Sequence, residues 1–270
     1  MTSTQDLGKH GEVRVYRDAE QVARAAAELF VETAAESIEA RGRFRVALSG
    51  GSTPRRVYEL LATPAFSSHV DWDSVDIFWG DERYVPAEDR DSNYGMTFEA
   101  FLRHVPVSAH RVPTQISPPS AAAAAYEEQI WQAFEDPSMP QFDLIYLGLG
   151  ANGHTASLFP YSPALRERSH LVVADFVAEV NGWRITMSAP LLNRGRTVAF
   201  LVEGQEKAPV LRDVLLGPPD PERLPAQLIA PEGKLLWIVD EAAATLLQST
   251  TQKPRVPGTA VSRAEKKRSA

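Results

Sequence analysis

Two kinds of segment follow one another along the chain. In one kind, apolar residues recur at helical spacing; the other is a short run that is either wholly apolar or switches between apolar and polar residues at every position. Val22, Ala26 and Phe30 fall on one helical face, which predicts a helix over Ala19–Arg41 that stops at Gly42. Strands are predicted at Glu12–Tyr16, Phe44–Leu48, Val75–Trp79, Asp143–Leu149, Leu171–Ala174, Arg184–Ser188, Thr197–Val202 and Leu235–Val239. Further helices are predicted at Pro54–Ala62, Asn93–Arg103, Pro118–Phe134, Glu206–Leu216 and Glu241–Gln248.

Strand and helix alternate nearly throughout, which predicts an α/β fold with a parallel sheet covered by helices on both faces. The chain shows no linker and no internal repeat before its last segment, so one domain is expected over residues 1–251. Residues 252–270 hold six Lys or Arg, one Glu and few large apolar residues, which predicts a disordered basic tail, with a tether to nucleic acid or to an anionic surface as the alternative.

The net charge of −7 conceals a more acidic body. Without the tail, 22 Lys and Arg stand against 34 Asp and Glu, a net charge of −12. An acidic surface repels polyanions, so nucleic acid is not expected as a partner, although a small anion can bind where donors are concentrated. The chain has no cysteine, which excludes disulfides, thiolate metal sites and a cysteine nucleophile.

Other classes of protein find little support. No segment approaches the ~18 apolar residues of a membrane helix, and no basic segment followed by an apolar one begins the chain. We therefore expect no membrane contact and a cytoplasmic location. There is no HExxH motif, so no metal site is expected. GLGANG matches a dinucleotide fingerprint weakly, because a histidine follows it directly, so no cofactor is expected.

The segment Ser49–Thr53 (SGGST) joins a predicted strand to a predicted helix. Its two glycines allow positive φ and a close approach of the backbone to a ligand. Ser52 or Thr53 is expected to cap the helix, and Pro54 suits the first turn. Free N–H groups and hydroxyls at the positive end of a helix predict a phosphate site, with a plain strand-to-helix turn as the alternative. Neither serine is expected to be a nucleophile, because the segment is not a GxSxG elbow.

A second polar segment, Gly80–Arg83 (GDER), directly follows the predicted strand Val75–Trp79. Carboxyl ends of parallel strands share one edge of a sheet, so this segment should lie beside the first. Arg83 can bind an anion through two hydrogen bonds. Asp81 or Glu82 can hold a water, orient a histidine or accept a proton, and a surface ion pair is the alternative.

The third segment, Gly148–Pro160 (GLGANGHTASLFP), follows a strand of buried type and carries the clearest signal. Its glycines leave space for a ligand, and His154 precedes a helix-like stretch, Thr155–Phe159. Histidine is the side chain whose ordinary pKa, about 6.5, suits proton transfer near neutrality, so His154 is expected to be catalytic. Arg184 and Lys207 can reach the same edge, or can be solvated charges.

Five ordered motifs resemble those of the 6-phosphogluconolactonase family and of its relative, glucosamine-6-phosphate deaminase. They are SGGSTP (49–54), GDER with SNYGM (80–83 and 92–96), GLGANGHTASLFP (148–160), RITMSAPLLN (184–193) and GQEKAPVL (204–211). The resemblance spans about Val13 to Leu247 and implies a Rossmann-like three-layer α/β/α fold with a mainly parallel central sheet. It implies metal-free hydrolysis of 6-phosphoglucono-δ-lactone, the second step of the oxidative pentose phosphate pathway. We expect a monomer or weak homo-oligomer whose partner is this phosphosugar lactone.

With this resemblance, His154 is expected to act as general base on a water. Backbone N–H groups around Gly150–Gly153, or an arginine, would stabilise the oxyanion. Asp81 is the second catalytic candidate. The expected substrate- and phosphate-binding residues are Ser49, Gly50, Gly51, Ser52, Thr53, Arg83, Gly150, Asn152, Gly153, Arg184 and Lys207.

The sequence departs from the family pattern at Asn152, where an acid usually precedes Gly-His. An amide can orient the histidine but cannot accept a proton or carry charge, so the chain either lacks that support or uses Asp81 instead. The deaminase pattern fits less well, because residues 155–159 contain no acid. It remains an alternative, with Asp81 as the base at substrate C2, and so does a sugar-phosphate-binding protein without catalysis.

Overall fold

The computed structural model describes residues 1–134 and 140–247. Within them, an eight-stranded central sheet has the order β1-β2-β11-β10-β7-β3-β4-β6. β1 is antiparallel to β2, and the other neighbouring pairs are parallel. The strands are β1 Ser3–Asp6, β2 Glu12–Tyr16, β3 Phe44–Leu48, β4 Val75–Trp79, β6 Ser108–Ala109, β7 Leu144–Gly148, β10 Thr197–Val202 and β11 Lys234–Asp240.

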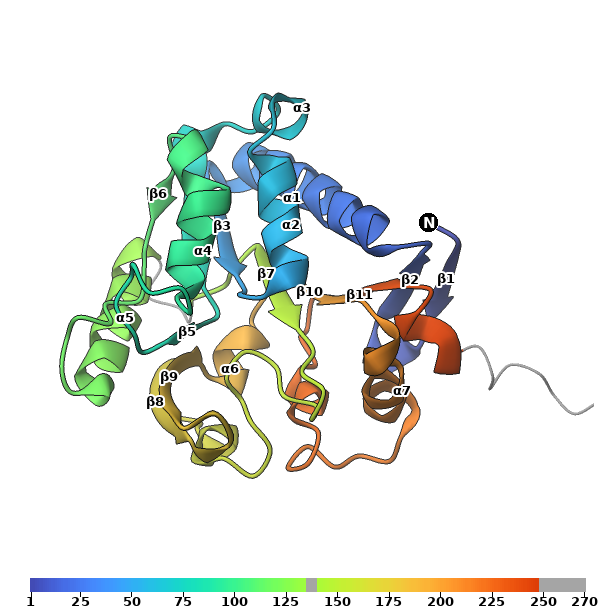
Figure 1. Cartoon of the computed structure of the whole chain (residues 1–270). Helices are drawn as coiled ribbons and strands as arrows, with labels where there is room; N and C mark the ends of the chain where they lie inside the picture. Colours follow the sequence, from blue (N-terminus) through green and yellow to red (C-terminus); the bar gives the residue numbers. More distant parts are fainter. Residues whose placement is uncertain (135–139, 248–270) are drawn as a thin grey trace, which may run out of the picture.

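Helices lie on both faces of this sheet (Figure 1). α1, α2 and α4 pack side by side on one face, and α5, α6 and α7 lie on the other side. The α-helices are α1 Ala19–Arg41, α2 Ser52–Leu61, α3 Pro64–Ser67, α4 Asn93–Ala100, α5 Pro119–Ala133, α6 Ala189–Leu192 and α7 Ala208–Leu216. The 3-10 helices are η1 Gly8–His10, η2 Trp72–Ser74, η3 Leu102–His104, η4 Pro163–Arg166, η5 Ala178–Val180, η6 Gln205–Lys207, η7 Pro225–Leu228 and η8 Ala243–Leu246.

Helix α1 shows how the sequence pattern produces the fold. The carboxylate of Asp18 accepts the N–H of Gln21 at 3.0 Å and caps the first turn. Gly42 ends the helix with φ 74°, in the left-handed region that glycine adopts without strain. Val22 and Phe30 lie on the buried face of the helix, so burial of this apolar stripe holds α1 against the sheet.

Two buried tyrosines fix the carboxyl ends of neighbouring strands. The Tyr58 hydroxyl, from α2, accepts the N–H of Ser49 at 3.1 Å and donates to its carbonyl at 2.7 Å. The Tyr126 hydroxyl, from α5, makes the same pair of bonds with Trp79, at 2.8 and 3.0 Å. Both strand ends are therefore held at the residue where the chain leaves the sheet, from the helices α2 and α5.

A second, three-stranded sheet corrects the predicted topology. β5 Asp81–Arg83, β9 Gly182–Met187 and β8 Val172–Val177 form an antiparallel sheet in that order. The sequence analysis placed the segments that became β8 and β9 in the parallel sheet. A short connection between two strands favours an antiparallel hairpin, because a parallel pair needs a long crossover.

Several predicted helix ends also differ from the structure. The helix predicted at Asn93–Arg103 is interrupted at Phe101, whose φ of −148° is not helical. The segment from Glu206 begins in the 3-10 helix η6 before α7, and the helix predicted over Glu241–Gln248 is the short 3-10 helix η8. By contrast, the predicted bounds of β2, α1, β3, β4 and β10 are confirmed.

The predicted domain boundary at residue 251 and the basic tail, residues 252–270, lie outside the described residues. The assignment of residues 1–251 to one domain stays a prediction. Among the helices that the structure describes, none is long and apolar enough to cross a membrane.

Candidate active site

A cavity of about 320 Å³ lies at the carboxyl ends of four neighbouring strands, β10, β7, β3 and β4. The sheet order reverses between β3 and β7, and open α/β sheets bind ligands at such a point. The cavity brings together most of the predicted site residues. Those that line it are Ser49, Gly50, Gly51, Ser52, Thr53, Asp81, Arg83, Gly150, His154 and Lys207.

The loop after β3 forms one wall of this cavity. Helix α2 begins at Ser52, two residues before the predicted start, so the prediction of Ser52 or Thr53 as the helix cap was wrong. Gly51 occupies that position with φ 111°, which only glycine adopts readily. The first N–H groups of α2 have no intrahelical acceptor and are available to an anion. Buried Ser49 Oγ has no hydrogen-bond partner among the described residues.

The two carboxylates after β4 differ in their surroundings. Asp81 borders the cavity, and its carboxylate accepts the hydroxyl of Ser157 at 2.6 Å. Burial raises the pKa of Asp81, while the Ser157 hydrogen bond, Arg83 and Arg184 oppose that shift. Asp81 is therefore placed to contact a ligand.

Glu82 instead supports the fold. Its two oxygens accept the N–H of Asn93 at 2.7 Å and of Tyr94 at 2.8 Å, at the start of α4. They also accept the N–H of Arg83 and the hydroxyl of Ser92, at 2.8 and 3.2 Å. Burial raises the pKa of Glu82 to about 7, against these hydrogen bonds. The carboxylate is thus committed to the first turn of a helix.

His154 is held on several sides at the end of β7. Its ring stacks on Phe159 with centroids 4.1 Å apart and an interplanar angle of 17°. Nδ1 lies 2.6 Å from Oδ1 of Asn152, which also accepts the His154 backbone N–H at 3.1 Å. The predicted helix-like segment after His154 is wrong, because Thr155 and Leu158 form an isolated β-bridge there.

The environment keeps this imidazole neutral. Burial, followed by the positive charges of Lys207, Arg184 and Arg83, lowers the pKa of His154 to about 4. A histidine that is unprotonated at neutral pH can accept a proton.

Two glycines make room for the histidine loop. A Cβ at Gly150 would overlap the ring of His154. Gly153 has φ 86°, and a Cβ there would lie 2.6 Å from Leu224 Cδ2. The Gly153 carbonyl accepts the N–H of Ala226 at 2.9 Å, which ties the loop to η7.

Two arginines stand near the cavity on facing strands. Arg83 of β5 pairs in register with Arg184 of β9. Arg83 donates to the Asp91 carbonyl at 2.7 Å, and Arg184 to the Trp183 carbonyl at 3.1 Å. These acceptors are uncharged, so the bonds do not neutralise the guanidinium groups. Burial and the charge of Arg83 lower the pKa of Arg184. Such a pair of cations favours an anion between them.

The model of one protein family, described as glucosamine-6-phosphate isomerases/6-phosphogluconolactonase, matches residues 17–237. The chain belongs to this family. The 6-phosphogluconolactonase of Homo sapiens is 37% identical over 252 residues, covering 90% of this chain and 96% of that protein. The 6-phosphogluconolactonase of Synechocystis sp. is 41% identical over 214 residues, covering 77% of this chain and 86% of that protein.

Solved structures of this family have the same architecture. That of 6-phosphogluconolactonase from Trypanosoma brucei has a TM-score of 0.78 at 29% identity, covering 87% of this chain and 98% of that chain. A monomeric glucosamine-6-phosphate deaminase has a TM-score of 0.73 at 20% identity, covering 87% of this chain and 99% of that chain, which is a likeness of fold. The predicted α/β fold and family resemblance are confirmed.

Three of the predicted site residues do not line the cavity. Asn152 contacts Nδ1 of the imidazole, Gly153 is tied to η7 through its carbonyl, and Arg184 lies across the ladder from Arg83. The suggestion that Asp81 replaces the family acid beside His154 finds no support, because the carboxylate bonds Ser157.

The sequence analysis missed three side chains around the site. Asn93 lines the cavity and donates to the Asp81 carbonyl at 2.9 Å; its place in the SNYGM motif was a signal for it. Ser157 lies in the histidine motif and binds Asp81. Glu179 accepts the side-chain N–H of Asn152 at 2.7 Å, and it lies in no motif.

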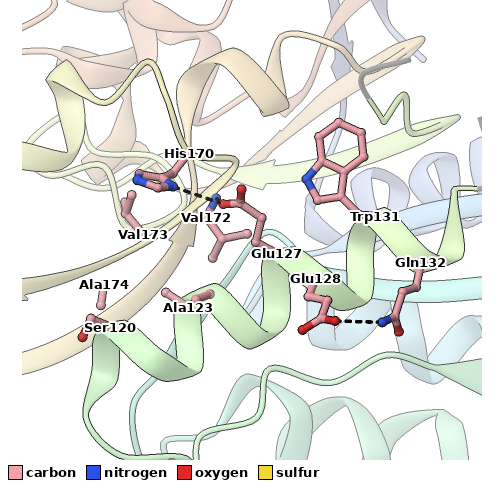
Figure 2. Close-up of a pocket in the computed structure, with 11 residues that line it drawn as sticks. Ser120, Ala123, Glu127, Glu128, Trp131, Gln132, His170, Val172, Val173 and Ala174 are labelled. Atoms are coloured by element: carbon pink, nitrogen blue, oxygen red, sulfur yellow. Dashed lines mark hydrogen bonds and ion pairs between the residues drawn. The ribbon is translucent and has the colours of Figure 1, made fainter. Parts of the chain in front are cut away.

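A larger hollow of about 650 Å³ lies between α5 and β8 (Figure 2). Its carboxylate Glu127 accepts the N–H groups of Leu171 and Val172 at 2.8 and 3.0 Å. Nδ1 of His170 lies 3.9 Å from the same carboxylate, and Figure 2 marks this ion pair with a dashed line. Glu127 thus fixes the start of β8. None of the predicted site residues lines this hollow, so the smaller cavity is the candidate active site.

Proposed function

We propose that this chain hydrolyses 6-phosphoglucono-δ-lactone to 6-phosphogluconate in the pentose phosphate pathway. Relatives with this activity in their names align over most of the chain, and the family is shared. The observation that carries the proposal is a neutral His154 on the wall of a cavity that also holds Arg83 and Lys207. Its volume of about 320 Å³ suits one small polar ligand.

The phosphate is assigned to the first turn of α2. Backbone N–H groups at Ser52 and Thr53 can donate to it, and the helix dipole adds positive potential. The unpartnered hydroxyl of Ser49 supports this assignment, because a buried polar group without a partner is costly unless a ligand completes it. Arg83 and Lys207 line the same cavity, and Arg184 stands opposite Arg83. Together they place positive charge at this cavity, in a chain whose net charge is −7.

The reaction needs one group that first accepts and then returns a proton. Nε2 of His154 takes a proton from water as the water oxygen attacks the lactone carbonyl carbon. The tetrahedral intermediate then collapses, the bond from that carbon to the ring oxygen breaks, and imidazolium protonates the ring oxygen. General acid–base help of this kind contributes ~10²–10⁴-fold. The N–H groups of Gly150 and Gly153 already donate to the carbonyls of His154 and Gly150, at 2.8 and 2.9 Å, so within this loop the N–H groups of Ala151 and Asn152 are proposed to stabilise the oxyanion.

Asp81 stays a proposal as the second catalytic residue. Its carboxylate borders the cavity and can accept a hydrogen bond from the attacking water or from a sugar hydroxyl. A cytoplasmic location and a monomeric or weakly associated state are also proposed, from the sequence alone.

The test is the rate of 6-phosphogluconate formation from freshly generated lactone, at slightly acidic pH where spontaneous hydrolysis is slow. We expect a large acceleration by the protein, and a loss of that acceleration in His154→Ala. Release of ammonia from glucosamine 6-phosphate instead would identify a deaminase. Binding of the phosphosugar without turnover of either compound would identify a binding protein, and either result would overturn the proposal.

A further inference from the structure

A chain of three polar side chains runs from the protein surface to the catalytic candidate. Glu179 Oε2 accepts a hydrogen from Asn152 Nδ2 at 2.7 Å. Asn152 Oδ1 in turn lies 2.6 Å from Nδ1 of His154 and accepts the His154 backbone N–H at 3.1 Å. Glu179 is on η5, at the tip of the hairpin between β8 and β9, and is 27 residues from Asn152 along the chain.

The chemistry of the three groups fixes the direction of each hydrogen bond. An ionised carboxylate can only accept, so the amide of Asn152 must turn its NH₂ group toward Glu179. Its oxygen then faces the backbone N–H and Nδ1 of His154, and an oxygen acceptor requires that Nδ1 carry the proton. The neutral ring therefore has its lone pair on Nε2, the nitrogen that a general base needs.

Without Glu179, the Asn152 amide loses the acceptor that favours this orientation of its NH₂ group. Asn152 could turn over and present its NH₂ group to the ring, which would place the lone pair on Nδ1 and the proton on Nε2. Among the contacts of Asn152 within residues 1–134 and 140–247, the bond to the His154 backbone N–H would then oppose the turn. Phe159 and Gly150 hold the plane of the ring but do not distinguish its two nitrogens.

We propose that Glu179 is a positioning residue, which acts through Asn152 to hold His154 in the tautomer with Nδ1 protonated. The chain thereby obtains from a distant hairpin the carboxylate that its motif lacks at position 152. The effect on catalysis rests on the proposed lactone hydrolysis, whereas the effect on the tautomer does not.

The expected size of the effect follows from the exposure of Glu179. Water can take the place of an exposed carboxylate, so the loss is smaller than the ~10²–10⁴-fold contribution of the general base itself. We expect Glu179→Ala to lower kcat about tenfold with little change in KM, because Glu179 does not line the cavity. Glu128→Gln, a change of one exposed carboxylate on α5, is the control and should leave kcat unchanged.

A change at position 152 separates positioning from a structural role. Asn152→Asp places a carboxylate directly against Nδ1, so Glu179 is no longer needed and becomes a like charge beside it. In this background, Glu179→Ala should lower kcat no further. An equal loss in both backgrounds would mean that Glu179 acts on the hairpin, not through Asn152, and would overturn the proposal.

Nitrogen-15 NMR of the His154 ring tests the tautomer without any turnover. The unsubstituted chain should show a protonated Nδ1 and an unprotonated Nε2 at neutral pH, and Glu179→Ala should show a mixture. A single, unchanged tautomer in Glu179→Ala would overturn the proposal. If no variant hydrolyses the lactone but the tautomer shifts as expected, the proposed function fails and the positioning role stands.

Discussion

Arg83 and Arg184 face each other in register across the ladder between β5 and β9, although both side chains are cationic. Like charges directly opposite on a sheet are destabilising. Burial and then the charge of Arg83 lower the pKa of Arg184, while Asp81, Asp91 and Glu82 oppose that shift. The pair is therefore unfavourable in the free protein, and a phosphate bound near both cations, as proposed above, would offset their repulsion.

Replacement of Arg184 by alanine should weaken selectivity for the phosphate and leave the fold intact. A charge-assisted hydrogen bond contributes about 1.5–3 kcal/mol, so KM for the phosphorylated lactone should rise about ten- to a hundredfold. Kinetics with phosphorylated and plain gluconolactone measure this, with Arg212→Ala on the surface of α7 as the control. An unchanged ratio of kcat/KM between the two lactones would remove Arg184 from the phosphate site.

The pKa of His154 should rise when a phosphosugar binds. In the free protein, burial and three cations lower the pKa of His154 to about 4, so the ring is neutral above that pH. As the pH falls through this value, the ring becomes protonated and can no longer accept a proton. A bound phosphate offsets the charges of Lys207, Arg184 and Arg83, which favours the protonated ring and moves its pKa upward. An NMR titration of His154, with and without 6-phosphogluconate, measures the shift. A pKa that stays constant or falls on binding would place the phosphate away from these cations.

Gly150→Ala should inactivate the site without unfolding the protein. The new methyl group would overlap the His154 ring, so the ring must move away from Asn152 and Phe159. We expect kcat to fall about a hundredfold, as for loss of a general base. Gly80→Ala is the matched control, since its nearest neighbour would be the Leu48 carbonyl at 3.7 Å. Full activity in Gly150→Ala would show that the observed ring position is not required.

Glu82→Gln should destabilise the protein without affecting substrate binding directly. Both oxygens of Glu82 accept hydrogen bonds. In glutamine, an NH₂ group replaces one of these oxygens, and its hydrogens would face the N–H donors that the oxygen accepted. The expected loss is about 1–3 kcal/mol in the free energy of unfolding. Denaturant titration measures it, and the exposed change Glu128→Gln should show no loss. Equal stability of the two variants would mean that Glu82 does not hold the start of α4.

The sequence predicted those parts of the fold whose causes are local. The apolar stripe and the stop at Gly42 lie within one segment, so α1 was predicted with its observed bounds without reference to the cap at Asp18. The second sheet could not be predicted in this way. β5 has three residues, and it becomes a strand only because β9, about a hundred residues later, pairs with it.

The same distinction applies to the candidate site. The sequence predicted that the motifs at the strand ends lie together, because the carboxyl ends of parallel strands share one edge of a sheet, and these motifs line one cavity. The different roles of Asp81 and Glu82 depend on which partner each carboxylate meets in space, Ser157 for one and the start of α4 for the other. Glu179 carries no local signal, since its link to Asn152 arises from the placement of a hairpin tip.

The hydroxyl of Tyr58 also explains how β3 can separate from β7 at the crevice. β3 pairs with β7 at Val46 and Ala47, and the chain then departs from its neighbour at Ser49. At that point, one phenolic oxygen serves both a donor and an acceptor of the backbone, as a neighbouring strand would have done. The backbone N–H and carbonyl of Ser49 therefore stay hydrogen-bonded where the strands part. The end of β3 is therefore held from helix α2, and the loop that follows it does not have to supply these two hydrogen bonds.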